Sequence, residues 1–171
     1  SYSLGAIDGA TTITAGATLQ INGNGLSIPE YISLAGSGIL YKGAIRNMGG
    51  DNTLTGLLTL SAASFISSDA TRTLTIDDKG LSAVGQSLYI EGEGNIVFTT
   101  DAPIYGTTAT LTKNDSGTLN IQSFSNITGT LTINKGELIF SHLGAMPLSV
   151  TIAINSGGKL TLNNAYSVVR D

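Results

Sequence analysis

Two adjacent aspartates, Asp77 and Asp78, are the first side chains in this sequence that could do chemistry. Glycoside hydrolysis uses two carboxyl groups placed on either side of the scissile bond. Adjacent residues of a strand point to opposite faces, so this pair could share a cleft only from within a turn. Residues 77–80 read Asp-Asp-Lys-Gly, which is typical of a turn, because Asp and Gly tolerate tight backbone conformations. We therefore interpret both aspartates as turn residues.

The single histidine and a pair of glutamates are further candidates for catalytic or metal-binding groups. His142 would need a nucleophile to deprotonate and a third group to orient it, and the Gly-x-Ser-x-Gly motif is absent. Glu91 and Glu93 could point to one side and hold Ca²⁺, but calcium takes about six to eight oxygen ligands. We expect an ordinary loop histidine and solvated glutamates. The sequence thus predicts no catalytic residue, no metal site and no cofactor.

Threonine pairs recur in the sequence and suggest a third kind of site. They are Thr73/Thr75, Thr110/Thr112 and Thr130/Thr132. On stacked strands such pairs could form a flat array of the kind found in ice-binding β-solenoids. Asn120 and Lys159 fall at equivalent positions and interrupt the array, and Thr is in any case a common outward residue of strands.

The elements that would position these residues are short strands. Residues 109–140 alternate apolar and polar residues, which is the pattern of a half-buried strand. Each run ends at a turn signal rich in Asn, Gly and Ser. Alternation across the chain predicts these inward residues: Ile13, Leu19, Ile21, Ile32, Leu34, Ile39, Ile45, Leu54, Leu58, Leu60, Ile66, Leu74, Ile76, Leu81, Val84, Leu88, Ile90, Ile96, Phe98, Leu111, Leu119, Ile121, Leu131, Ile133, Leu138, Phe140, Val150, Ile152, Ile154, Leu160 and Leu162.

The spacing of the apolar residues predicts how the strands stack. The intervals are 20 residues from Leu111 to Leu131, 19 from Leu119 to Leu138, 21 from Leu131 to Ile152 and 22 from Leu138 to Leu160. A period of roughly 20–29 residues with several short strands is that of a solenoid, whose coils bury their apolar sides on one another. We predict an all-β fold: one single-stranded, right-handed parallel β-helix of seven or eight coils over residues 1–171.

Two segments depart from the alternation, and no segment has the pattern of an amphipathic helix. Residues 27–50 are irregular and predict a bulge or a longer loop. Residues 101–108 are the best candidate for a linker or loop. These insertions carry the aromatic and basic residues that could bind a partner, namely Tyr31, Tyr41, Arg46 and Tyr105.

The central stretch, residues 109–140, contains a spaced set of Leu, Ile, Lys and Gly residues: Leu111, Lys113, Gly117, Leu119, Ile121, Gly129, Gly136 and Leu138. In these residues it resembles the autotransporter-associated β-strand repeat of large bacterial surface proteins. Asp115, Ser125 and Ile127 depart from the family pattern, and we interpret these as changes at surface turns or of side-chain size. Residues 16–26 and 43–52 resemble segments that precede such repeats. The resemblance implies a passenger region exported to the bacterial cell surface or beyond it.

Composition narrows the range of partners. The net charge is −4, only 12% of residues are charged, and no basic patch is present, so we expect no nucleic-acid partner. Cysteine is absent, which excludes disulfides and thiol chemistry. No run of about 18 apolar residues occurs, so we expect no membrane insertion within this segment. The chain begins without Met or a signal peptide, and we interpret it as a mature piece or an excised fragment.

These observations favour a structural function. We expect a stalk or passenger segment of an extracellular or surface-displayed bacterial protein, with weak adhesion to host-cell or matrix surfaces, glycans or itself. One alternative is a β-helical carbohydrate-active enzyme, which a cleft with convergent carboxylates and arginine would favour. The sequence places none of its three arginines near Asp77. The other alternative is a ligand- or ice-binding β-solenoid.

Overall fold

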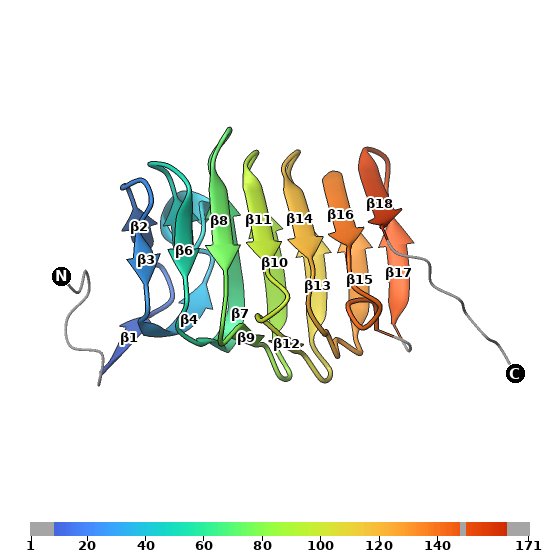
Figure 1. Cartoon of the computed structure of the whole chain (residues 1–171), viewed down its shortest axis with the longest axis horizontal. Coiled ribbons are helices and arrows are strands. Elements are labelled where there is room, and N and C mark those ends of the chain that lie inside the picture. The colour runs from blue at the N-terminus through green and yellow to red at the C-terminus, as the bar shows by residue number, and fades with distance from the viewer. Residues whose placement is uncertain (1–8, 148–149, 164–171) are drawn as a thin grey trace, which may run out of the picture.

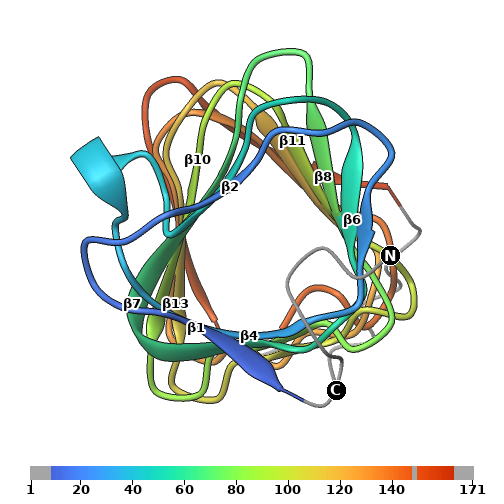
Figure 2. The ribbon, with the colours of Figure 1, turned by 90° about the vertical axis from the view of Figure 1, so that its left-hand side faces the viewer.

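The strands of the chain lie side by side along one long axis (Figure 1). The structure, a computed structural model, describes residues 9–147 and 150–163. It is an all-β parallel solenoid of about seven turns, and the turns superimpose when viewed along the axis (Figure 2). The predicted all-β parallel solenoid is therefore confirmed. Among the described residues the one helical element is a short 3₁₀ turn, η1 (Ile39–Tyr41).

Two parallel sheets form the walls of the solenoid. The larger is eleven-stranded, and its main path is β1 (Ala10–Ile13), β4 (Tyr31–Gly36), β7 (Leu58–Ser68), β10 (Ser87–Glu91), β13 (Thr110–Lys113), β15 (Thr130–Ile133) and β17 (Thr151–Ile154). Beside this path lie β2 (Leu19–Ile21), β5 (Ile45–Asn47), β9 (Leu81–Ser82) and β12 (Ile104–Tyr105). The seven-stranded sheet contains β3 (Ser27–Ile28), β6 (Asn52–Leu54), β8 (Thr73–Ile76), β11 (Asn95–Phe98), β14 (Thr118–Ile121), β16 (Gly136–Phe140) and β18 (Gly158–Leu162).

The register between coils follows the sequence period. Leu131 pairs with Leu111 on one side and with Ile152 on the other. On the second sheet, Leu138 pairs with Leu119 and with Leu160. All four intervals read from the sequence are thus direct pairings between neighbouring coils. A slip by one residue would turn each inward leucine to solvent, so the apolar pattern itself specifies the register.

The interior is a continuous apolar core, and most of the predicted inward residues line it. The prediction of an inward side chain is wrong at four positions, which are exposed instead: Ile39 (56%), Val84 (57%), Ile154 (51%) and Leu162 (47%). Ile39 belongs to η1, which projects away from the solenoid (Figure 2), and Val84 lies in the turn after β9. Ile154 and Leu162 belong to β17 and β18, beyond which no described strand stacks.

The two irregular segments differ in structure. Within residues 27–50 the pairing of β4 with β7 shifts register between Leu34 and Gly36, and η1 follows, so the predicted bulge and loop are confirmed. Residues 101–108 are not a linker. They contain β12, which pairs with β9 and buries Ile104. The sequence does not predict this strand, because it has two residues, Ile104 and Tyr105, of which only Ile104 faces the core.

Two departures from the repeat pattern are buried. Ile127 is 1% exposed, which fits a change of side-chain size, whereas Ser125 is 3% exposed and does not lie on a surface turn. The glycines of the pattern have a steric reason. At Gly117 an added Cβ would lie 1.9 Å from the carbonyl oxygen of Gly94 on the preceding coil, so only glycine allows the two backbones to approach.

Candidate functional site

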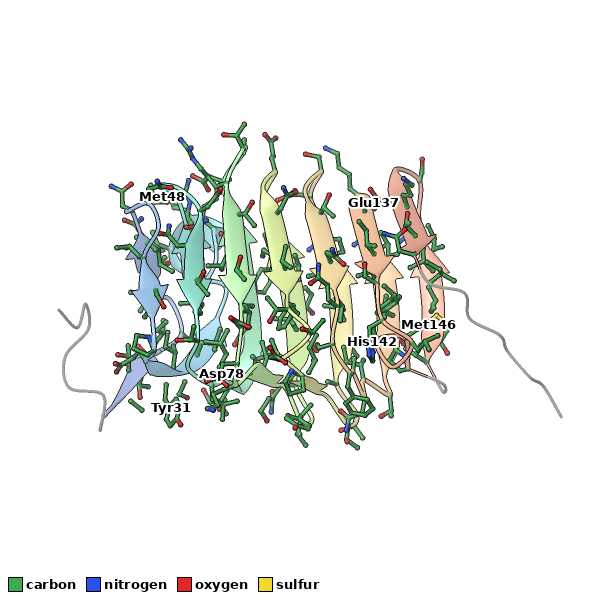
Figure 3. All side chains as sticks on the ribbon, viewed as in Figure 1. Tyr31, Met48, Asp78, Glu137, His142 and Met146 are labelled. Atoms are coloured by element: carbon green, nitrogen blue, oxygen red, sulfur yellow. The ribbon has the colours of Figure 1, made fainter. Side chains whose placement is uncertain are left out.

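A polar groove of about 530 Å³ lies where β5, β7 and β10 end, and we call it the corner groove. Its lining combines Tyr41 with three cationic and four acidic side chains: Lys42, Arg46, Arg72, Asp69, Glu91, Glu93 and Asp115. Met48 also lines it and lies at the upper edge of the solenoid in Figure 3. These residues come from corners of successive coils, which the stacking brings together.

The loop over residues 37–44 forms one wall of the corner groove and is fixed to the coils beneath. Thr18 Oγ1 accepts a hydrogen bond from the backbone N–H of Ile39 at 2.7 Å and donates to the carbonyl of Gly43 at 2.9 Å. The Ser67 hydroxyl donates to the carbonyl of Lys42. The loop is therefore tied to two neighbouring coils.

Inside this loop the backbone adopts an uncommon conformation. Leu40 and Tyr41 have φ values of 53° and 59°, in the left-handed region that non-glycine residues rarely enter. Such conformations persist where the surroundings impose them, and they occur often at functional sites. The result is a tyrosine that is 78% exposed at the border of the groove.

Arg46 and Asp69 form a two-pronged ion pair across adjacent coils. Arg46 Nε donates to Asp69 Oδ1 at 2.9 Å, and Nη2 donates to Oδ2 at 2.7 Å. The hydrogen bond to Asp69 is the main cause that raises the pKa of Arg46 above its usual value. Paired bonds of this kind fix the planes of both groups, so the groove holds a guanidinium in a set orientation.

Glu91 is held at the end of a column of asparagines. Asn155 Nδ2 donates to Asn134 Oδ1 at 2.6 Å, Asn134 Nδ2 donates to Asn114 Oδ1 at 2.7 Å, and Asn114 donates to Glu91. Burial raises the pKa of Glu91, with Asp115 adding to the rise, while the bond from Asn114 opposes it. The expectation of a solvated Glu91 is wrong, because the side chain is half-buried.

Beneath the groove a lysine is buried among apolar residues. Lys113 is 1% exposed and stands in register with Ile90 and Ile133 of the neighbouring coils. Its ammonium donates to the carbonyl of Asp115, and burial lowers its pKa to about 8. The Asp115 carboxylate accepts from the backbone N–H of Gly92 at 2.8 Å, which links this corner to the preceding coil.

Only two of the four predicted binding residues share this site. Tyr41 and Arg46 line the corner groove, whereas Tyr31 and Tyr105 do not. Tyr31 begins β4 and lies at the opposite edge of the solenoid from Met48 (Figure 3). Tyr105 is on β12 and is 46% exposed. The four residues therefore do not form one surface.

The Asp77-Asp78 pair lies in a turn, as predicted. The turn joins β8 to β9, and Asp78 adopts a positive φ of 57°. The Asp77 carboxylate accepts from the hydroxyl of Thr99, while Asp78 pairs with Lys79 at 3.0 Å. Asp77 is thus held by a residue of the next coil and Asp78 by its neighbour in the turn.

His142 lies in the loop after β16, as predicted, and its Nδ1 accepts a hydrogen bond from the backbone N–H of Gly144 at 3.0 Å.

Glu91 and Glu93, the pair that could hold Ca²⁺, both line the corner groove. Within residues 9–147 and 150–163, no group of three or more His, Cys, Asp or Glu side chains is placed to hold a metal ion.

The threonine pairs belong to two different sheets. Thr112 pairs with Thr132 on the eleven-stranded sheet, whereas Thr73 and Thr75 are on β8 of the other sheet. Tyr89 and Ala153 flank the Thr112–Thr132 row in register. Asn120 and Lys159 are also on the seven-stranded sheet. On the eleven-stranded sheet the threonine row is therefore interrupted by Tyr89 and Ala153, and not by Asn120 and Lys159.

The sequence reasoning missed the asparagine column and the groove. Asn114, Asn134 and Asn155 recur at intervals of 20 and 21 residues, the same period as the leucines, so the column could have been found. The groove gave no such signal, because its residues are spread from Tyr41 to Asp115.

Comparison with known proteins gives no identification: no family model, no curated protein and no solved structure matches this chain. In the part of the chain that the structure describes, no helix is long and apolar enough to cross a membrane.

Proposed function

We propose that this chain is a stalk or passenger segment of a secreted or surface-displayed bacterial protein of the autotransporter type. Its regular coils act as a spacer, and its irregular insertions carry weak adhesion. The observation that carries the proposal is the unbroken coil-to-coil pairing from β1 to β17 and from β3 to β18. Each coil contacts only its neighbours, so the fold adds length without needing a central site. About seven turns at a strand spacing of about 4.8 Å span roughly 34 Å.

The autotransporter assignment rests on the repeat residues. Gly117 is required by its contact with Gly94, and Leu119 and Leu138 pair in register on successive coils. Lys113 fills an inward position in the same segment. These features give the sequence pattern a physical reason, and they support a repeat that stacks on copies of itself.

The strand faces are poor candidates for tight binding. The outward residues of β13, β14 and β15 are Thr and Asn, whereas binding hot spots depend on aromatic residues and Arg. The interrupted threonine row also weighs against an ice-binding face, since Tyr89 and Ala153 flank it. We therefore place adhesion in the insertions.

A β-helical carbohydrate-active enzyme is the second candidate, because the corner groove does bring carboxylates and arginines together. Incubation with plant and bacterial polysaccharides, followed by measurement of new reducing ends, tests it. The stalk proposal predicts no product. Product formation that disappears in Glu91→Gln would replace the stalk with an enzyme.

The stalk proposal is tested by display of the chain on beads, with binding to host cells, glycans and free chain measured. We expect weak binding that is lost when Tyr31, Tyr41 and Tyr105 are changed to Ser together, because all three rings are exposed. Tyr41 lies in η1, Tyr31 is the first residue of β4 and Tyr105 is the last residue of β12. Tight binding that survives this change but is abolished by substitutions from Thr110 to Thr132 would place the site on the strand face and contradict the proposal.

A further inference from the structure

We propose that the corner groove binds a neutral oligosaccharide. The inference rests on the adhesive part of the proposed function and names its ligand class. The groove has a volume of about 530 Å³, which lies within the usual range of roughly 300–1,000 Å³ for small-molecule sites. Its wall is the loop over residues 37–44, which hydrogen bonds fix in place.

Several groups in the groove are held in position before any ligand arrives. Asp69 fixes the guanidinium of Arg46 with two hydrogen bonds. Asn114 donates to Glu91, and Gly92 donates to Asp115. Groups that are already ordered lose less conformational entropy on binding. The groove therefore offers fixed donors and acceptors to a ligand that has several hydrogen-bonding groups.

The charges favour a ligand without net charge. Three cationic side chains and four acidic ones line the groove, so its formal charge is +3 − 4 = −1. A polyanion would face the carboxylates and the net charge of −4 on the chain, whereas a polycation would face Arg46, Arg72 and Lys42. Hydroxyl groups both donate and accept, so a polyol can use the cationic and acidic side chains together.

Tyr41 supplies the apolar contact that such a ligand needs. It lines the groove and is 78% exposed, so most of its side chain is open to a ligand. Aromatic rings combine apolar area with a polar tip, and they therefore suit a sugar, which has both C–H faces and hydroxyls. The uncommon backbone conformation at Leu40 and Tyr41 keeps this residue at the border of the groove.

The test is titration calorimetry and ligand-observed NMR with the full chain and a panel of neutral oligosaccharides built from glucose, galactose, mannose and N-acetylhexosamines. We expect saturable binding to at least one of them, with a Kd on the order of millimolar. Tyr41→Ser should weaken it at least about tenfold, a difference of about 1.4 kcal/mol. The double variant Arg72→Gln/Glu93→Gln should weaken it similarly, and it keeps the net charge at −4 − 1 + 1 = −4.

Tyr105→Ser is the matched control, because Tyr105 is an exposed tyrosine outside the groove. Its binding should equal that of the parent, and circular dichroism should show that all variants keep the fold. Absence of binding to every neutral sugar, or binding that only Tyr105→Ser weakens, overturns the inference. A preference for polyuronate or oligolysine over neutral sugars also overturns it. The spacer role is measured separately by the length of the solenoid, so failure of the sugar-binding inference is distinguished from failure of the spacer proposal.

Discussion

Replacement of the buried lysine by methionine should stabilise the protein at neutral pH. Lys113 occupies a position that Ile90 and Ile133 fill on the adjacent coils, and burial lowers its pKa from 10.5 to about 8. The charged form is therefore disfavoured in the folded state, since its ordinary pKa applies when the chain unfolds. Lys113→Met keeps a long unbranched side chain and removes the charge.

The expected gain in the free energy of unfolding follows from the shift in the pKa of Lys113. A fall from 10.5 to about 8 corresponds to about 3 kcal/mol at about 1.36 kcal/mol per unit. Loss of the hydrogen bond to the Asp115 carbonyl opposes the gain by about 1 kcal/mol. We therefore expect Lys113→Met to be about 2 kcal/mol more stable at pH 7.

The sign of the pH dependence is opposite to that of a surface lysine ion pair. Between pH 8 and 10.5 the unfolded chain binds more protons at Lys113 than the folded chain does, so the free energy of unfolding of the parent rises with pH. The charges nearest to Lys113 are those of Asp115 and Glu91, which raise its pKa, and Lys135, which lowers it. The free energy of unfolding of Lys113→Met should not show this rise with pH. The difference in stability between the variant and the parent should therefore disappear above pH 10.5.

Equilibrium unfolding in urea at several pH values from 7 to 11 measures both effects. Lys79→Met is the control, because Lys79 is exposed and its pKa is raised by Asp78 rather than lowered. That variant should keep the rise seen in the parent. The reasoning is refuted if Lys113→Met is less stable than the parent at pH 7 and follows the same pH dependence.

Two further pairs of substitutions test the register and the asparagine column. Leu131→Asp should lower the free energy of unfolding by more than about 3 kcal/mol, because it buries an unpaired charge. Thr130→Ser should lower it by less than about 1 kcal/mol, because Thr130 is at an exposed strand position. Equal loss of stability in the two variants, measured by thermal unfolding, would contradict the register. Asn134→Ala breaks hydrogen bonds to both neighbouring coils and should cost about 1–2 kcal/mol. Asn95→Ala, at an exposed position of β11, should change stability by less than about 0.5 kcal/mol, and an equal loss there would argue against the column.

The fold could be predicted because the apolar pattern alone specifies it. Leu111, Leu131 and Ile152 recur at the period of one coil, and they pair directly in the structure. The errors occur where the chain leaves that pattern. Ile39 is apolar but lies in a projecting 3₁₀ turn, and Val84 lies in a turn beside a two-residue strand. Alternation cannot distinguish such residues from inward ones.

The candidate site was less predictable because it depends on contacts between coils. Tyr41 and Arg46 stood out by residue type, but their separation from Glu91 and Asp115 in the sequence hides the groove that they share. Lys113 shows a related difficulty. Its position predicts an inward side chain and its charge predicts an outward one, and the position prevails because the ammonium reaches the Asp115 carbonyl.

The length of a lengthened solenoid tests the spacer role most directly. Residues 111–130 make one coil, since Leu111 pairs with Leu131, and insertion of three further copies after Thr130 preserves this interval. Small-angle X-ray scattering should show a maximum dimension greater by about 14 Å, three coil spacings of about 4.8 Å, with an unchanged cross-section. A thicker particle, or the scattering of a partly unfolded chain, would contradict the claim that the coils stack as independent units of length.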